Sequence, residues 1–283
     1  MSAIVTKVDI IQRLAAARGY RHYLEVCTPG TGGRFRELEP ARFATVQRLL
    51  YRCGPDFDDG MAVDYRIADD SVAGFLKTLG AVAPVPDIAL VDSWHDYGVS
   101  RRDLVGVFAL LPEGGAMVVH DCRPPHAEAA APVAVSAEWC GTTYKAFLDF
   151  VLERADLDYL TVDIDYGCGV VTKRATDAGR ARTAPGRAKA CVLRLAGIFR
   201  RAAGPGRGET TATSLPEILR SAAGPRAGRD PPTSDDERRR AALVAEWRTL
   251  GDDFDAAWAL FAANDKALLN LVSVDDFSAG LGG

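Results

Sequence analysis

The sequence lacks a long apolar run, a paired cysteine motif and an excess of positive charge. No stretch reaches the roughly 20 apolar residues of a membrane-spanning helix, so we expect no membrane partner. The six cysteines are scattered without a C-x-x-C pair, which predicts reduced thiols and a cytoplasmic protein. A formal net charge of -4 argues against a nucleic-acid partner, because nucleic-acid-binding proteins usually present a basic face. Asp9 and Arg13 fall inside the first apolar stretch and exclude a signal peptide.

The remaining composition, 48% hydrophobic and 25% charged, is that of an ordinary globular protein. Changes in composition along the sequence divide the chain into an α/β domain over 1–173, a linker or loosely ordered insertion over 174–234 and a helical extension over 235–283. The extension begins with a capping box, Ser234 to Glu237. Its apolar stripe from Leu243 to Val272 needs a partner surface, either the α/β domain or a second subunit. If the stripe packs against a second subunit, we expect a homodimer through these helices.

Strand-like and helix-like patterns alternate over the first region. We expect parallel strands at 23–27, 61–64, 87–91 and 115–119, and an antiparallel pair at 160–163 and 169–172. Apolar residues at helical spacing predict helices at 4–19, 35–51, 70–79, 101–111 and 143–153. This alternation predicts a Rossmann-like, doubly wound α/β fold, with a mostly parallel sheet, an antiparallel closing strand and the C-terminal helical extension.

Two of the expected strands end in an acid and a histidine. The segments are Asp87-Ile-Ala-Leu-Val-Asp92-Ser-Trp-His95 and Gly114-Gly-Ala-Met-Val-Val-His120-Asp121. In an open parallel sheet, ligands bind outside the carboxyl ends of the strands. We therefore expect these carboxylates and imidazoles to converge on one crevice, where they could act in catalysis and hold a metal.

A glycine-containing loop follows the first expected strand. In Glu25-Val-Cys-Thr-Pro-Gly30-Thr-Gly32-Gly33 the glycines allow close backbone approach to a ligand. The loop is neither the dinucleotide G-x-G-x-x-G pattern nor a P-loop, because no G-K-[ST] follows. It is typical of a nucleotide-like cofactor site, and it is also a common structural turn.

Together these motifs resemble the class I S-adenosylmethionine-dependent methyltransferases over about residues 20–172. The residues that carry the resemblance are Tyr23-Leu-Glu-Val, Met61-Ala-Val-Asp64, Asp92-x-x-His95-x-Tyr97, the run from Leu110 to Asp121, and Trp139-Cys-Gly. The glycine loop departs from the E-x-G-x-G-x-G of the family. The C-terminal 110 residues match nothing that we can assign.

The resemblance implies S-adenosyl-L-methionine as the cofactor. Glu25, Gly30 and Gly32 would surround its methionine part. An acid after the second strand would hold the ribose, and Asp64 is the first choice, with Glu39 as the alternative. Asp69 or Asp70 would approach the adenine. The alternative for the three aspartates is that they are solvated loop acids.

The strand-end motifs are similar to those of metal-dependent O-methyltransferases that modify antibiotic sugars, a part of natural product biosynthesis. This similarity implies His95 as the general base and Asp92 and Asp121 as ligands of a divalent ion. The ion would be Mg²⁺ or Mn²⁺, and it would lower the pKa of a bound hydroxyl. His120 stands where those enzymes have an acid. As a softer ligand it favours Mn²⁺, Fe²⁺ or Zn²⁺, and the alternatives are a second base or a hydrogen-bonding residue.

The acceptor is expected to be a small molecule. Trp139 and Tyr144 could wall its pocket or could belong to the core at a helix start. Asp163 and Asp165 flank a turn, where aspartate is favoured for conformational reasons, although this edge could face the acceptor.

Two other functions use the same residues. A metal-dependent hydrolase could act through the Asp92, His95, His120 and Asp121 cluster, and a non-catalytic scaffold could bind a cofactor without turnover. The glycine loop favours the methyltransferase over the hydrolase. The intact pairs of acid and histidine argue against the scaffold.

Overall fold

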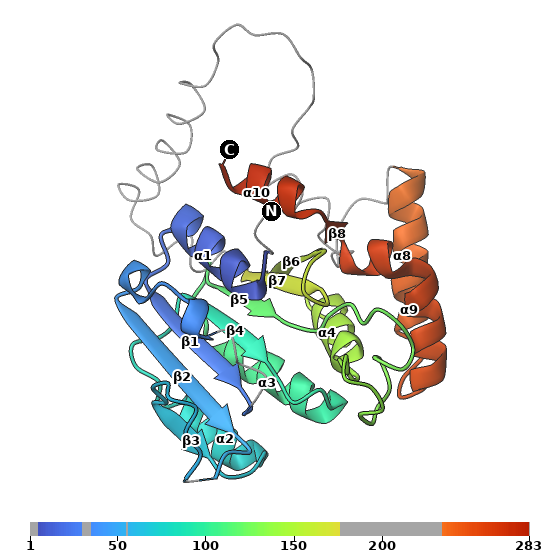
Figure 1. Cartoon of the computed structure of the whole chain (residues 1–283). Coiled ribbons are helices and arrows are strands. Elements are labelled where there is room, and N and C mark those ends of the chain that lie inside the picture. The colour runs from blue at the N-terminus through green and yellow to red at the C-terminus, as the bar shows by residue number, and fades with distance from the viewer. Residues whose placement is uncertain (1–4, 30–34, 55, 176–233, 283) are drawn as a thin grey trace, which may run out of the picture.

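The computed structural model of this chain describes residues 5–29, 35–54, 56–175 and 234–282. An eight-stranded sheet lies at its centre, in the order β3-β2-β1-β4-β5-β7-β6-β8 (Figure 1). The strands are β1 (His22–Cys27), β2 (Thr45–Tyr51), β3 (Tyr65–Ile67), β4 (Ile88–Asp92), β5 (Ala116–Val119), β6 (Leu157–Val162), β7 (Cys168–Lys173) and β8 (Leu271–Val272). Every strand runs parallel to the others except β7. The predicted fold class, with its antiparallel closing strand, is confirmed.

Helices cover both faces of this sheet. One face carries α1 (Lys7–Arg18) and α10 (Val274–Gly282), which lie side by side (Figure 1). The other face carries α2 (Val72–Leu79), α3 (Tyr97–Leu110) and α4 (Thr143–Leu152), and beyond α4 lie α8 (Asp235–Trp247) and α9 (Phe254–Leu269). Two short 3-10 turns, Phe35–Glu37 and Pro40–Arg42, precede β2. Among the described residues, no helix is long and apolar enough to cross a membrane.

Successive strand residues point to opposite faces and so build two cores. On β4, Ala89 and Val91 belong to the core under α2, α3 and α4, whereas Ile88 and Leu90 belong to the core under α1. This period of two places Asp92, the next residue in the second series, on the α1 side. The first residue of α1 therefore lies over the end of β4.

The helix predicted over 35–51 is wrong, because its second half is the strand β2. Phe43, Val46, Leu49 and Leu50 have the spacing of a helix face, but the segment also contains the polar Gln47 and Arg48. In the structure both polar residues are buried in the sheet, Arg48 being 1% exposed and paired with Asp59 at 2.8 Å. A strand buried on both faces loses the alternating pattern that would reveal it.

The strand predicted at 61–64 is also misplaced, since β3 begins at Tyr65. Asp64 therefore precedes the third strand instead of following the second. Its carboxylate accepts a hydrogen bond from the Arg48 backbone N–H at 2.8 Å, and its own N–H donates to the Arg48 carbonyl at 3.0 Å. The side chain prolongs the strand pairing at the edge of the sheet.

The C-terminal extension is helical, as predicted, and its apolar stripe is buried within the chain. The buried residues include Val244, Trp247, Phe261 and Leu268, and they belong to the same core as α4 and β6. The α/β domain is thus the partner surface, and the stripe no longer supports a homodimer. Nearly all of the predicted linker, 174–234, lies outside the described residues.

Candidate active site

Asp92 lies at the point where the order of the sheet reverses. Strand β1 pairs with β2 on one side and with β4 on the other, and Cys27 at the end of β1 is in register with Asp92 at the end of β4. In doubly wound sheets this reversal opens a crevice at the carboxyl ends of the strands. His120 and Asp121 follow β5, the next strand, so the two predicted motifs meet at one edge.

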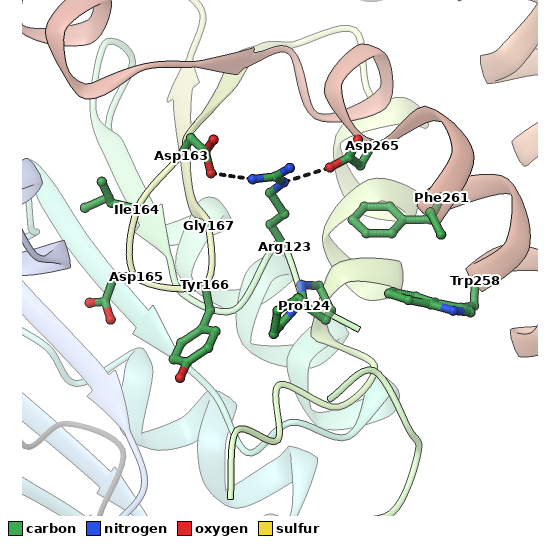
Figure 2. Close-up of a pocket in the computed structure, with 12 residues that line it drawn as sticks. Arg123, Pro124, Asp163, Ile164, Asp165, Tyr166, Gly167, Trp258, Phe261 and Asp265 are labelled. Carbon is green, nitrogen blue, oxygen red and sulfur yellow. Dashed lines mark hydrogen bonds and ion pairs between the residues drawn. The ribbon is translucent and has the colours of Figure 1, made fainter. Parts of the chain in front are cut away.

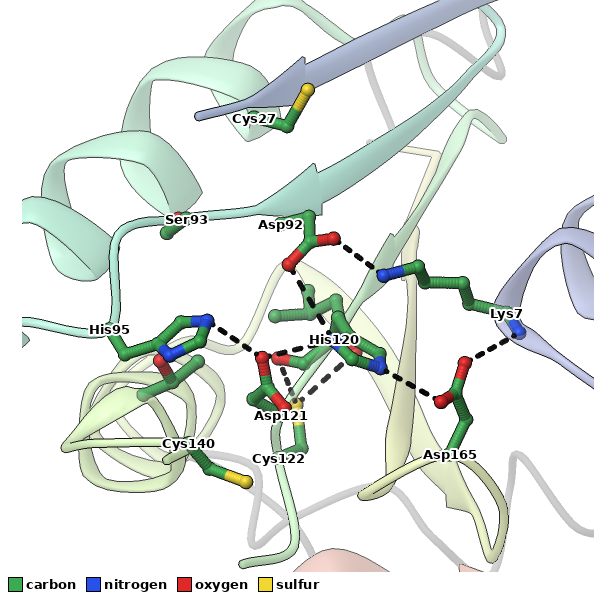
Figure 3. Close-up of polar contacts among 12 residues, drawn as sticks. Lys7, Cys27, Asp92, Ser93, His95, His120, Asp121, Cys122, Cys140 and Asp165 are labelled. Carbon is green, nitrogen blue, oxygen red and sulfur yellow. Dashed lines mark hydrogen bonds and ion pairs between the residues drawn. The ribbon is translucent and has the colours of Figure 1, made fainter. Parts of the chain in front are cut away.

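Asp121 is the centre of the cluster that forms there (Figure 3). Its Oδ2 atom lies 3.0 Å from His95 Nε2 and 2.9 Å from His120 Nδ1. A left-handed backbone, with φ of 59°, turns this side chain back toward both rings. Such a conformation is uncommon outside glycine and is tolerated best by Asp and Asn. The cluster therefore depends on an aspartate at this position for both its charge and its backbone.

Two residues that the sequence analysis did not assign to this site complete the cluster (Figure 3). The ammonium group of Lys7 lies 2.6 Å from Asp92 Oδ2, and both side chains are buried. Asp165, in the turn between β6 and β7, lies 3.4 Å from His120 Nε2 and accepts a hydrogen bond from the Lys7 backbone N–H at 3.3 Å. Three carboxylates and three basic side chains are thus gathered at one strand edge.

Burial and charge act in opposite directions on these groups. For the carboxyls of Asp92 and Asp121, burial raises the pKa, but neighbouring cations outweigh it and lower the pKa of both acids. These cations are Lys7 and His120 for Asp92, and His120 and His95 for Asp121. Burial lowers the pKa of His120, yet the Asp121 charge holds that pKa well above its usual value. The pKa of Asp165 falls to about 2, because contact with His120 outweighs burial. Each acid is stable as an anion because a cation lies against it.

The His95 ring and backbone are both held by neighbouring residues. Trp139 lies against it with ring centroids 5.1 Å apart, and the Thr142 backbone N–H donates to the His95 carbonyl at 2.8 Å. Gly141 passes so close that a Cβ atom there would lie 2.7 Å from the His95 Cβ. Nε2 faces Asp121, while Nδ1 is buried and makes no hydrogen bond with any residue in the described part of the chain. His95 therefore has one nitrogen in contact with the Asp121 carboxylate and one buried nitrogen without a partner in the described part of the chain.

Asp92, His95 and Asp121 have the spacing of a metal site. Each offers one ligand atom, and these atoms all lie within 4.8 Å of one another. One nitrogen and two carboxylate oxygens form a donor set that suits Mn²⁺ or Mg²⁺. The predicted ligand His120 is not a member of this set. It bridges the acids instead, with Nδ1 3.5 Å from Asp92 Oδ1 and Nε2 toward Asp165.

Glu25 is buried in the middle of β1, two residues before its end. The Tyr23 hydroxyl donates to Glu25 Oε2 at 3.0 Å and the Cys27 thiol donates to Oε1 at 3.2 Å. Burial raises the pKa of this carboxyl to about 7, even though these donors and Arg48 favour its ionised form. The predicted cofactor loop follows β1 in the sequence, and its Gly30 and Gly32 lie outside the described residues.

The predicted ribose ligands are not where the prediction required them. The end of β2 carries Arg52 in place of an acid, and Asp64 is used by the Arg48 backbone. Glu39 is exposed and pairs with Arg42 at 2.6 Å. The misreading of 35–51 as a helix caused this error, because it moved the second strand to the wrong segment.

Asp69 and Asp70 do follow the carboxyl end of β3, as an adenine contact would require. Asp69 is exposed and accepts a hydrogen bond from the Ser71 backbone N–H at 2.9 Å. Asp70 lies 3.9 Å from the Arg52 guanidinium, which itself stacks 4.2 Å from the centre of the Trp94 ring. Arg52 and Trp94 therefore form a flat surface at the strand ends next to these acids.

A pocket of about 580 Å³ opens beside the cluster (Figure 2). Asp165 belongs to both, since it lines the pocket and contacts His120. Trp258 and Phe261 of α9 form an apolar wall, and Arg123 bridges Asp163 in the β6–β7 turn and Asp265 on α9. The C-terminal extension thus supplies part of the wall of this pocket.

The two aromatic residues predicted to wall an acceptor pocket have different environments. Tyr144 is 1% exposed and packs against Trp258 and Phe261, so it supports the pocket wall from behind and belongs to the core. Trp139 is half-buried beside His95 and Trp94, and its indole N–H donates to the Ala131 carbonyl at 2.7 Å. Neither residue lines the pocket in Figure 2.

Of the two residues of the cluster that were not predicted, Lys7 is the one whose buried ion pair the sequence could have indicated. It shares a helix face with Ile10, Ile11 and Leu14, all buried. A lysine on the apolar face of a helix needs a buried partner, because an unpaired buried charge is costly. This signal predicts an acidic partner for Lys7 without indicating which one.

No protein-family model and no curated protein sequence matches this chain. Its structure is similar to solved structures of methyltransferases. A putative caffeoyl-CoA O-methyltransferase from Staphylococcus aureus is 15% identical, with a TM-score of 0.42 over 60% of this chain and 85% of that one. The O-methyltransferase TomG from Streptomyces achromogenes, in complex with SAM, is also 15% identical, with a TM-score of 0.42 over 62% and 84%. MycE, from the mycinamycin biosynthetic pathway in complex with Mg, SAH and mycinamycin VI, is 18% identical, with a TM-score of 0.38 over 60% and 50%. At these identities the similarity concerns the fold.

Proposed function

We propose that this protein transfers a methyl group from S-adenosyl-L-methionine to an oxygen of a small hydroxylated or sugar-like metabolite. The observation that carries the proposal is the pairing of His95 with Asp121 at the carboxyl edge of the sheet. His95 Nε2 lies 3.0 Å from the carboxylate, and the buried Nδ1 has no hydrogen-bond partner among the described residues. An imidazole oriented by a carboxylate on one nitrogen is the arrangement of a general base.

In this proposal His95 accepts the proton of the acceptor hydroxyl as its oxygen attacks. Asp121 orients the ring and stabilises the imidazolium that forms. Trp139 and the backbone at Gly141 hold the ring in place, so that little ordering remains for the reaction step. S-adenosyl-L-methionine, when bound, supplies an electrophilic methyl group on a sulfonium centre.

The cofactor would bind where the sheet order reverses, at the ends of β1 and β4. Cys27 and Asp92 are in register there, and the predicted glycine loop follows β1. Asp69 or Asp70 remains the predicted contact for the adenine. The predicted divalent ion at Asp92 and Asp121 would lower the pKa of the acceptor hydroxyl, but Lys7 already lies 2.6 Å from Asp92 Oδ2, so the proposed reaction does not depend on an ion.

The acceptor would occupy the pocket between the β6–β7 turn and α9. Trp258 and Phe261 offer flat apolar surfaces to a ring, and Asp165 and Arg123 offer polar partners to its hydroxyl groups. Because Asp165 also contacts His120, a ligand in this pocket would lie beside the cluster. A pocket of about 580 Å³ is within the usual range for a small metabolite.

Transfer of label from methyl-tritiated S-adenosyl-L-methionine to a panel of polyols, sugars and phenols tests the proposal. We expect His95→Gln to lower the rate by about 10²–10⁴-fold, the usual contribution of a general base. Its affinity for S-adenosylhomocysteine should stay within a few-fold of the wild type, because the base acts on the acceptor. The matched control is His126→Gln, since His126 is exposed and its ion-pair partner is Glu138. Equal rates for His95→Gln and wild type would contradict the assignment of the base.

A further inference from the structure

Lys7 is held against the candidate site by two separate contacts. Its ammonium group lies 2.6 Å from Asp92 Oδ2, and its backbone N–H donates to Asp165 at 3.3 Å. As the first residue of α1, Lys7 is positioned by a helix whose N-terminal turn is closed by a capping box between Thr6 and Asp9. The lysine is therefore a fixed part of the cluster, although 85 residues separate it from Asp92.

The position of this ammonium group conflicts with that of a divalent ion. Asp92 is 1% exposed and is one of the three residues with metal-ligand spacing. Its Oδ2 atom is taken by Lys7, and its Oδ1 atom lies 3.5 Å from His120 Nδ1. An ion bound to Asp92 and Asp121 would lie within a few ångströms of the ammonium group and be repelled by it.

The charges of the cluster are also balanced without an ion. Buried carboxylates need compensation, which a metal or paired basic side chains can supply. Asp92 and Asp121, the more deeply buried acids, already contact Lys7 and His120. A bound divalent ion would add charge to a site whose acids are already paired.

We propose that Lys7 is the resident cation of this site, so that its ammonium group takes the place of a divalent ion on Asp92. Two consequences follow. The wild-type chain does not take up a divalent ion at Asp92, His95 and Asp121, and a neutral residue in place of Lys7 turns these three residues into a metal site. A third consequence depends on the proposed function, because methyl transfer by the wild type then needs no added metal.

Titration of Mn²⁺ into chelator-treated full-length protein, followed by the electron paramagnetic resonance signal of free Mn²⁺, tests the first two consequences without any activity. We expect no stoichiometric uptake by the wild type at submillimolar Mn²⁺. Lys7→Met should bind one Mn²⁺ at least tenfold more tightly than the wild type, and Asp121→Asn in the same background should abolish this binding.

Lys145→Met is the matched control. Lys145 is also a buried lysine, 2.8 Å from Asp149, but it lies on α4 away from the cluster. Its loss leaves Asp149 with hydrogen bonds from Tyr97 and Trp247 and creates no set of three ligands, so no Mn²⁺ uptake is expected. If Lys7→Met does not fold, as judged by circular dichroism, Lys7→Gln replaces it, since its amide can still donate a hydrogen bond to Asp92.

Uptake of one Mn²⁺ by the wild type with the affinity of the Lys7 variant would overturn the proposal. Failure of the folded variants to bind Mn²⁺ would do the same. A labelled-methyl assay in excess EDTA tests the third consequence, and unchanged transfer by the wild type is expected. If no methyl transfer is found under any condition, the proposed function fails while the Mn²⁺ result still decides the role of Lys7.

Discussion

Glu25 makes the stability of this protein depend on pH in a way that can be calculated. The carboxyl is 1% exposed, and its pKa is raised by burial from 4.5 to about 7. Between these two values the folded chain keeps a proton that the unfolded chain releases. The contribution to stability is therefore fully present below pH 4.5 and is lost as the pH rises through 7.

The size of the loss follows from the difference between the two pKa values, about 2.5. At about 1.4 kcal/mol for each pH unit, the wild type should lose about 3 kcal/mol from this group between pH 4.5 and pH 8. Glu25→Gln keeps the shape and remains neutral at every pH. It also keeps one carbonyl acceptor for the two donors, Tyr23 and Cys27. The variant should therefore gain about 3 kcal/mol relative to the wild type over this range.

Urea denaturation at a series of pH values, monitored by tryptophan fluorescence, measures this difference. The relevant quantity is the change with pH, because any constant effect of the amide cancels. Glu128→Gln is the control, since it makes the same substitution at an exposed position. If the curves of Glu25→Gln and wild type run parallel from pH 4.5 to pH 8, the reasoning about Glu25 is refuted.

Three further substitutions test the packing around the site. Gly141→Ala should lower activity and destabilise the fold by about 1–3 kcal/mol more than the control Gly251→Ala. Both glycines have a positive φ, but only Gly141 lies against His95. Equal free energies of unfolding for the two variants would contradict this. Trp247→Ala should lower the free energy of unfolding by about 3–5 kcal/mol, since the buried ring fills the core under α8. Val133→Ala, at a site 70% exposed, should leave this free energy almost unchanged. Denaturation of both variants measures the difference, and a loss below about 1 kcal/mol for Trp247→Ala would show that α8 contributes little. Trp258→Ala should raise the KM for the acceptor about tenfold, because it removes part of the pocket wall. The affinity for S-adenosylhomocysteine should not change. An unchanged KM would show that the acceptor binds elsewhere.

The centre of the candidate site could be predicted from the sequence because topology alone brings it together. Asp92 and Asp121 each follow an apolar run of strand length, and neighbouring parallel strands end at the same edge. His95 is close enough in sequence to Asp92 to reach the same crevice. No knowledge of distant contacts was needed for these three residues.

The rest of the site depends on contacts between distant segments. Lys7 and Asp165 come from a helix and a turn far from β4 in the chain, and no local pattern joins them to it. The second strand was missed because Val46, Leu49 and Leu50 share a helix-like spacing, whereas the buried Arg48 is accommodated in the sheet by a distant partner, Asp59. The pocket wall on α9 could not be predicted because it depends on how the extension packs against α4.

Calorimetric titration of S-adenosylhomocysteine into the purified full-length chain, first in EDTA and then with Mn²⁺, tests the central claim most directly. We expect binding of one molecule with a micromolar Kd that is the same in both solutions. Absence of binding under both conditions would contradict the methyltransferase assignment and return the Asp92, His95 and Asp121 cluster to the hydrolase or scaffold interpretation.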